Sequence, residues 1–490
     1  MSFKRIKEIE KEIEMAQLTV DREYMPLYHA APPVGWINDP NGFVYFNGCY
    51  HLYGQFCPYS SQWGLMHWGH WTSTDLVHWR WCGVALAPDT PADEGGCFSG
   101  SSWVVEDTLY IAYTGLCSDG KGGYNQLQCI ASSKDGYTFE KMAGNPVIGK
   151  AELPEGASPY DFRDPKLMRD ANGFRVIAAA QVNGKGKLLS FTSQDLEKWH
   201  YEGVFWEGMP QMLECPDIFE LAGKTSVLTS IIGMPKDGRR YPHDQPSLFF
   251  RGEDGKMPIQ MIPETLTVLD HGQDFYAAQT TLAPDGRRLL IGWFQCWAHK
   301  YMPTDELGHG WNGCMSLVRE LEWKEGKLIQ RPVAEIERLR DDPREINQTI
   351  GEKSFEWLNA SDASEIQLEL TNITAASVTL ELMKTGEECL LIRYEPEAEL
   401  LTVDTSKCGH KIRCEKDRVL PQMTQTDVKE VDGRLMLRMF VDRCSLEIFV
   451  GEGEAVISTR IFPKKHGRGI CLSAVGGEAD ARLVVYDLMI

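Results

Sequence analysis

The sequence predicts an all-β protein in which a five-bladed β-propeller is followed by a C-terminal β-sandwich. Three observations support this prediction: a repeat of fixed length in the first part of the chain, short apolar runs bounded by turn residues, and a two-residue apolar alternation in the last part. Short strands at regular spacing are typical of propellers, and alternation is typical of sheets with one solvated face.

The first expected element is a short amphipathic helix in an N-terminal extension, residues 1–24. Ile6, Ile9 and Ile13 have the three- and four-residue spacing that gathers side chains on one helix face. The segment lacks the apolar core of a secretory signal peptide, and no part of the chain reaches the ~18 apolar residues of a membrane span. We therefore expect a cytoplasmic protein with no membrane partner.

A repeat of 60 residues organises the region that follows. The segment Ser73–Trp79 (Ser-Thr-Asp-Leu-Val-His-Trp) returns at Ser193–Trp199, and a weaker copy, Ser133–Phe139, lies midway. Residues 25–335 hold about five such periods, which predicts five radial blades of four strands each.

Three motifs fall at the same early place in successive periods: Trp36–Gly42, Phe98–Ser101 and Arg163–Pro165. The first strand of each blade lines the central channel of a propeller. Motifs that are about 60 residues apart in the sequence are therefore expected to converge on one axial pocket.

The character of the chain changes near residues 333–352, where a charged, helix-like segment ends at Asp341-Asp342-Pro343. We assign residues 336–352 to a linker and residues 353–490 to the second domain. Apolar and polar residues alternate there, as in an antiparallel sandwich with one wet face per sheet. The alternating sets are Ile366, Leu368, Leu370; Val378, Leu380, Leu382; Leu435, Leu437, Met439, Val441; and Leu446, Ile448, Val450.

Composition excludes some functions. The formal net charge is −20, so we expect no nucleic-acid partner. The fourteen cysteines include no Cys-x-x-Cys pair, which favours buried reduced thiols over disulfides. His67 and His70 have the spacing of a helical zinc pair, but their segment is strand-like and has no further ligands nearby. We expect no metal and no cofactor.

Three carboxylates lie in short motifs of unlike sequence: Asp39, Asp164 and Glu214. Each alone has an ordinary structural explanation, because Asp-Pro and Asn-Gly are turn dipeptides and a lone Glu is usually exposed. Cleavage of a glycosidic bond needs one carboxylate at the anomeric carbon and one carboxylic acid at the leaving oxygen. A third acid could bind sugar hydroxyls, so the set favours a sugar-cleaving site.

Trp36–Gly42, Phe98–Ser101, Arg163–Pro165 and Glu214–Asp217 resemble, in this order, the motifs of glycoside hydrolase family 32. That family contains invertases, sucrose-6-phosphate hydrolases and fructanases. Further similar segments are Met66–His70, Asp75–Trp79, Asp274–Gln279, Gly310–Gly313 and Asp442–Phe449. The chain departs from the common pattern at Ile37, Leu213 and Val318, where many members carry Met, Trp and Pro.

The resemblance implies a role for each carboxylate. Asp39 would be the nucleophile that attacks C2 of a β-fructofuranosyl unit, and Glu214 the general acid and then base. Asp164 would stabilise the transition state by binding the fructose 3- and 4-hydroxyls. The expected substrate-binding residues are Trp36, Asn38, Gln55, Trp63, Phe98, Ser99, Arg163 and Trp293.

The expected function is that of a retaining β-fructofuranosidase that hydrolyses sucrose, sucrose 6-phosphate or short fructo-oligosaccharides. Fructosyl transfer and fructan exo-hydrolysis would use the same carboxylates and stay open. Two less favoured hypotheses are a sugar-binding protein without catalysis and a related five-bladed enzyme that acts on pentosides. The leaving group stays undecided from the sequence, as does assembly into a homo-oligomer through sandwich edges.

Overall fold

The computed structural model describes residues 5–241, 243–253, 257–353, 355–358 and 361–490. The expected N-terminal helix is α1 (Ile6–Ala16), which packs on β4 (Arg80–Leu86) through the buried side chains of Ile9 and Ile13. None of the described helices combines the length and apolar composition that crossing a bilayer requires.

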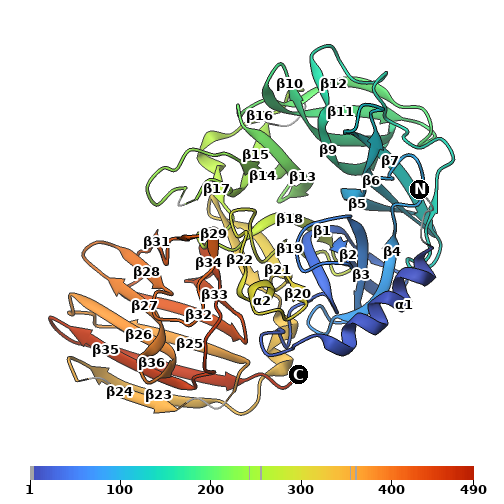
Figure 1. The fold of residues 1–490 in the computed structure, drawn as a ribbon. Coiled ribbons are helices and arrows are strands. Elements are labelled where there is room, and N and C mark those ends of the chain that lie inside the picture. The colour runs from blue at the N-terminus through green and yellow to red at the C-terminus, as the bar shows by residue number, and fades with distance from the viewer. Residues whose placement is uncertain (1–4, 242, 254–256, 354, 359–360) are drawn as a thin grey trace.

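The predicted five-bladed propeller is confirmed. Five antiparallel sheets surround one axis (Figure 1), and their first strands contact one another in a closed ring: β1 with β5, β5 with β9, β9 with β13, β13 with β18, and β18 with β1. Blades I and II consist of β1 (Gly35–Phe46), β2 (Cys49–Cys57), β3 (His67–Ser73) and β4, and of β5 (Cys97–Val105), β6 (Thr108–Ser118), β7 (Tyr124–Ser133) and β8 (Glu140–Lys141). Blades III and IV consist of β9 (Ala157–Asp170), β10 (Gly173–Val182), β11 (Lys185–Ser193) and β12 (His200–Trp206), and of β13 (Met212–Leu221), β14 (Lys224–Ile232), β15 (Ser247–Glu253), β16 (Gln260–Met261) and β17 (Thr267–Val268). Blade V consists of β18 (Tyr276–Leu282), β19 (Arg288–Trp293), β21 (Arg319–Lys324) and β22 (Lys327–Pro332). The short β20 (Trp311–Asn312) pairs in parallel with β1 and joins the last blade to the first.

The repeated Ser-x-Asp sequence forms the turn between the third and fourth strands of three blades. In blade III the Ser193 hydroxyl accepts the backbone N–H of Leu196 at 2.9 Å, and Asp195 accepts that of Lys198 at 2.8 Å. The same pairs of hydrogen bonds recur after Ser73 and Ser133. Side chains that bind nearby backbone N–H groups are the usual reason why Ser and Asp occur in turns.

The C-terminal region is a sandwich of two six-stranded sheets, as predicted. One sheet has the order β23 (Arg344–Ile350), β36 (Ala479–Asp487), β25 (Ser364–Thr371), β32 (Arg434–Asp442), β33 (Ser445–Val450), β34 (Ala455–Arg460); the other has β24 (Phe355–Leu358), β35 (Gly469–Val475), β26 (Ser377–Thr385), β27 (Glu388–Glu395), β28 (Leu400–Asp404), β31 (Met423–Asp427). The alternating apolar residues of the sequence form the shared core between the sheets.

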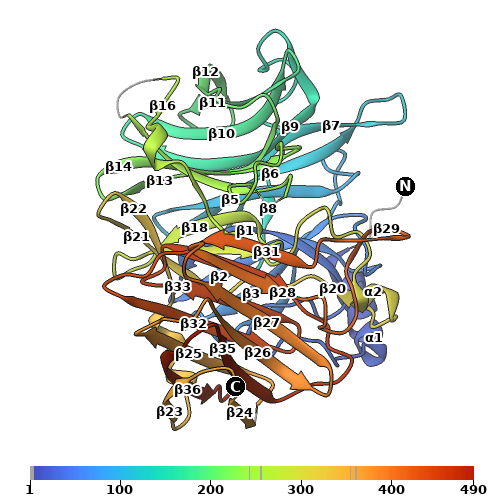
Figure 2. The same cartoon turned by 90° about the vertical axis from the view of Figure 1, so that its left-hand side faces the viewer.

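The segment 336–352, which we expected to be a linker, differs from that expectation. It contains the end of the 3₁₀ helix Ala334–Leu339 and all of β23, which pairs with β36 along its full length. By its hydrogen bonds this segment therefore belongs largely to the sandwich. The sandwich lies beside the propeller in Figure 1, and in Figure 2, where it faces the viewer, it overlaps the lower part of the propeller. All fourteen cysteines are free thiols, and most of them are buried.

Candidate active site

Each first strand of the propeller breaks its register with the second strand at one corresponding place. The shifts lie between Ile37 and Pro40 in β1, between Phe98 and Gly100 in β5, opposite residues 163–166 of β9, between Glu214 and Asp217 in β13, and between Tyr276 and Gln279 in β18. A β-bulge redirects side chains locally, and bulges are common beside active sites. Three of these bulges hold a residue with positive φ: Asp164 (φ 61), Cys215 (φ 48) and Ala277 (φ 53). The three expected catalytic carboxylates therefore lie at or beside equivalent irregularities around the axis.

Asp39 lies in the bulge of β1 and is 7% exposed. Its Oδ2 accepts the Ser99 hydroxyl at 2.6 Å, while Oδ1 has no hydrogen-bond partner among the described residues. Burial raises the pKa of Asp39 to about 6, and the negative charge of Glu214 adds to this rise. The carboxyl group is therefore mostly ionised above pH 6 and keeps one oxygen free for a ligand.

Glu214 ends the regular part of β13 before the bulge. Its Oε1 lies 3.0 Å from Nε and 2.9 Å from Nη2 of Arg163, and its Oε2 accepts the hydroxyl of Tyr276 at 2.7 Å. Arg163 also approaches Asp164, with 4.0 Å between Nε and Oδ2. One guanidinium thus joins two of the three predicted catalytic carboxylates.

Asp164 faces Asp39 across a cysteine. The Cys215 backbone N–H donates to Asp164 Oδ2 at 2.9 Å, and the Cys215 sulfur is 3.7 Å from this oxygen and 3.6 Å from Asp39 Oδ2. Burial raises the pKa of Asp164 to about 7 although Arg163 lowers it, and the charges of Glu214 and Asp39 raise it further. Two buried carboxylates and the partly exposed Glu214, from three blades, therefore form one mutually repelling cluster.

A cavity of about 430 Å³ opens onto this cluster. Its lining residues are Asn38, Asp39, Gln55, Trp63, Phe98, Ser99, Gln126, Asp161, Arg163, Asp164, Glu214, Ile232 and Trp297. All three predicted catalytic carboxylates line it, together with six of the eight predicted substrate-binding residues. A volume of this size suits a small molecule of one or two sugar rings.

The two remaining predicted wall residues, Trp36 and Trp293, do not line the cavity. Trp293 is 0% exposed and packs edge-on against Trp36 and Trp297, with ring centroids 5.7 Å and 5.1 Å apart. Trp36 donates its indole N–H to Asn38 at 2.8 Å. These two rings therefore stand behind the wall, and Trp297 takes the position at the cavity that we expected for Trp293.

Four lining residues were not expected from the sequence: Gln126, Asp161, Ile232 and Trp297. Only Asp161, two residues before the Arg163 motif, had a nearby sequence signal. Cys215 and Tyr276 contact the carboxylates from inside motifs that the resemblance had already included. The bulges also had a signal, because Pro40, Pro165 and Pro216 lie in first strands, and proline inside a sheet is confined to bulges and edges.

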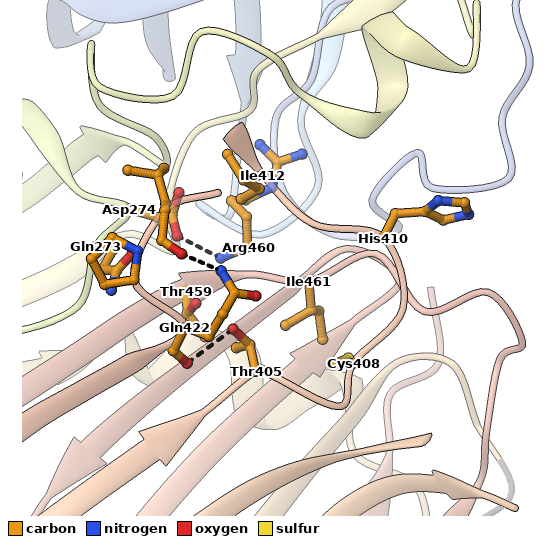
Figure 3. Close-up of a pocket in the computed structure, with 12 residues that line it drawn as sticks. Gln273, Asp274, Thr405, Cys408, His410, Ile412, Gln422, Thr459, Arg460 and Ile461 are labelled. Atoms are coloured by element: carbon orange, nitrogen blue, oxygen red, sulfur yellow. Dashed lines mark hydrogen bonds between the residues drawn. The ribbon is translucent and has the colours of Figure 1, made fainter. Parts of the chain in front are cut away.

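A second, much smaller pocket lies between the propeller and the sandwich. Figure 3 shows the residues that line it. It holds about 20 Å³, enough for little more than one water molecule. In it the backbone N–H of Arg460 donates to Asp274 at 2.8 Å, so Asp274 joins the two domains.

His67 and His70, the pair with zinc-like spacing, bind different partners. His67 contacts the carbonyl of Leu65, and His70 hydrogen-bonds to His51. Both side chains are buried in blade I, and these contacts give each of them a structural role.

Comparisons with known proteins identify the family of the chain. Residues 29–332 match the family described as "Glycosyl hydrolases family 32 N-terminal domain", and residues 335–487 match "Glycosyl hydrolases family 32 C terminal". The sucrose-6-phosphate hydrolase of Escherichia coli is 38% identical over 482 residues, which is 93% of each chain, and the raffinose invertase of Escherichia coli is 36% identical over 468 residues, again 93% of each chain.

Solved structures show the same similarity over the full chain. The β-fructofuranosidase of Bombyx mori has a TM-score of 0.83 at 34% identity and covers 99% of this chain and 98% of its own. The sucrose-6-phosphate hydrolase of Lactobacillus gasseri has a TM-score of 0.86 at 28% identity, with 98% and 96% covered. The chain belongs to glycoside hydrolase family 32, and it is a glycoside hydrolase.

Proposed function

We propose that the protein is a retaining β-fructofuranosidase that hydrolyses sucrose and similar terminal β-fructofuranosides. The observation that carries this proposal is the convergence of Asp39, Asp164 and Glu214, from three first strands, on one cavity. The relatives support the substrate class, since they include enzymes named for sucrose 6-phosphate and raffinose, and a Bombyx mori enzyme variant was solved with sucrose.

The proposed reaction has two displacements. In the first, Asp39 attacks C2 of the fructosyl unit, the C2–oxygen bond to the leaving group breaks, and Glu214 gives its proton to that oxygen. In the second, Glu214 takes a proton from water, the water oxygen bonds to C2, and the bond from Asp39 to C2 breaks. Asp164 binds the sugar hydroxyls and stabilises positive charge that develops on the fructosyl ring. Arg163 contacts Glu214 and Asp164 and holds the two carboxyl groups in position.

Catalytic substitutions test this proposal. Asp39→Asn and Glu214→Gln should each lower kcat for sucrose by at least about 10³-fold, because the first removes the nucleophile and the second removes the proton donor. Asp107→Asn, a change at an exposed carboxylate 77% accessible to solvent, is the control and should leave kcat unchanged. Anomer analysis by NMR should show that β-fructose is released first. Initial release of α-fructose would contradict a covalent role for Asp39.

The charges of the cavity favour an uncharged leaving group. Its lining includes four carboxylates and one guanidinium, and Arg163 is already within 4.0 Å of three of those carboxylates. We propose a higher kcat/KM for sucrose than for sucrose 6-phosphate, since the phosphate meets net negative charge. The KM for sucrose 6-phosphate should fall as salt rises from about 20 to 200 mM, because repulsion is screened, while that for sucrose stays constant. A preference for the phosphorylated substrate at low salt would overturn this part.

Fructosyl transfer uses the same first displacement and differs only in the acceptor. Product analysis with added fructo-oligosaccharide would separate the two, because transfer lengthens the acceptor and hydrolysis yields free fructose. The proposal also includes a cytoplasmic location, which the fourteen free thiols favour because reduced thiols suit a reducing compartment. Cell fractionation tests the location.

A further inference from the structure

We propose that Tyr276 is a positioning residue for Glu214, and that Oε2 of Glu214, the oxygen facing this tyrosine, carries the catalytic proton. The inference rests on the proposed function and deepens it by naming the reacting atom of the acid. Tyr276 belongs to blade V, which supplies none of the three proposed catalytic carboxylates.

The two oxygens of Glu214 have different partners. Oε1 is bound by Nε and Nη2 of Arg163, at 3.0 Å and 2.9 Å. A guanidinium has only N–H donors and stays protonated, so it cannot accept a hydrogen bond from a protonated Oε1. A proton on Oε1 would therefore face the two N–H donors of Arg163 and find no acceptor. The proton that Glu214 gives to the leaving oxygen must reside on Oε2.

The partner of Oε2 can act in both protonation states. The Tyr276 hydroxyl is 2.7 Å from Oε2, and a phenolic hydroxyl both donates and accepts. Burial and the charge of Glu214 hold the pKa of Tyr276 well above its usual value, so the hydroxyl stays neutral at working pH. It donates to one lone pair of Oε2 and leaves the other lone pair for the proton that goes to the leaving oxygen.

The fold fixes this hydroxyl in place. Tyr276 is 0% exposed, and its ring packs edge-on against Trp293 with centroids 6.5 Å apart. It directly precedes the bulge of β18, where Ala277 has a φ of 53° and donates its N–H to the Ser230 hydroxyl at 2.9 Å. The bulge of β18 thus lies beside the hydroxyl donor that orients Glu214. The bulges of β1, β9 and β13 lie in the same way beside the three carboxylates.

The test is Tyr276→Phe, assayed with two substrates. Sucrose has a poor leaving group and needs full proton donation, whereas an aryl β-D-fructofuranoside such as the p-nitrophenyl glycoside needs little. We expect kcat/KM, which reports the first displacement, to fall about 10- to 100-fold for sucrose and less than about threefold for the aryl substrate. The alkaline limb of the pH profile for sucrose should move to higher pH, because a donor that favours the carboxylate is lost.

Tyr113→Phe is the matched control. The Tyr113 hydroxyl also donates to a buried carboxylate, Asp93 Oδ2, at 2.7 Å, but neither residue lines the cavity. This variant should lose stability without any change in the pH profile or in the ratio of the two substrates. It separates the loss of a buried hydrogen bond from the loss of this particular hydrogen bond.

A second variant guards against misfolding of the first. Site-specific 3-fluorotyrosine at position 276 keeps the ring and hydroxyl but donates more strongly, so the alkaline limb should move to lower pH. Equal losses for both substrates in Tyr276→Phe, with unchanged pH limbs in both variants, would overturn the inference and leave a packing role. Failure of the proposed function is distinguishable, because Glu214→Gln would then keep its activity on sucrose whatever Tyr276 does.

Discussion

Asp39 and Asp164 are almost completely buried, and both lie close to a third carboxylate. Their pKa values, about 6 and about 7, are raised because ionisation in this setting costs free energy. Asp164 also has a positive φ of 61°, which is unfavourable for a residue with a side chain. The proposed reaction needs both groups ionised and close together. Their burial and mutual repulsion therefore lower the free energy of unfolding.

The pH dependence of stability should reveal this conflict in Asp39→Asn. The folded-state pKa of Asp39, about 6, exceeds the ordinary value of 3.8, so its contribution to stability is full below pH 3.8 and is lost as pH rises through 6. An amide does not ionise and escapes the loss. We expect the substitution to raise the free energy of unfolding at pH 8 by up to about 3 kcal/mol and to change it little at pH 4.

Urea denaturation at both pH values measures the difference. A variant that is less stable than the native protein at pH 8, or shifted equally at pH 4 and pH 8, would contradict the electrostatic explanation. The Ser99 hydroxyl that donates to Asp39 can also donate to the amide oxygen of the variant. The change in stability therefore reports the loss of the charge and not the loss of this hydrogen bond.

At the scale of strands, the sequence signals that succeeded are local ones. The Ser-x-Asp turn recurs because each of three blades closes its third and fourth strands with the same hydrogen bonds. The two-residue alternation of the sandwich recurs because one face of each sheet packs on the other. Both patterns can be recognised without knowing which strands pair.

The features that escaped prediction depend on contacts between distant segments. Trp293 and Trp297 are both tryptophans, and the sequence alone does not distinguish them. The path of the chain after β19 brings Trp297 to the cavity, whereas Trp293 is fully buried. The Tyr276 hydroxyl reaches a carboxylate 62 residues away in sequence. The strand β23 is mostly polar and exposed, so it shows no alternation, and its pairing with β36 defines it.

For the whole molecule, a buried ionic network joins the propeller to the sandwich. Arg319 of blade V is 0% exposed, and its Nη2 lies 2.8 Å from Asp270 and 2.9 Å from Glu447 of the sandwich. His29 completes the network: burial lowers its pKa, but hydrogen bonds with Asp442 and Glu447 outweigh this and raise it to about 9. The positive charges of both residues therefore balance buried acids at neutral pH.

Loss of one partner should destabilise the joined domains strongly. Arg319→Met leaves Asp270 and Glu447 buried with less compensation, and breaking such a group typically costs about 3–5 kcal/mol. Arg331→Met is the control, because Arg331 is 36% exposed and its partners Glu322 and Glu452 are about half exposed, so its loss should cost under about 1 kcal/mol. Calorimetry measures both variants, and neutralising the two acids as Asp270→Asn and Glu447→Gln in the Arg319→Met background should recover part of the loss. A cost for Arg319→Met no larger than that of the control would mean that the network does not hold the two domains together.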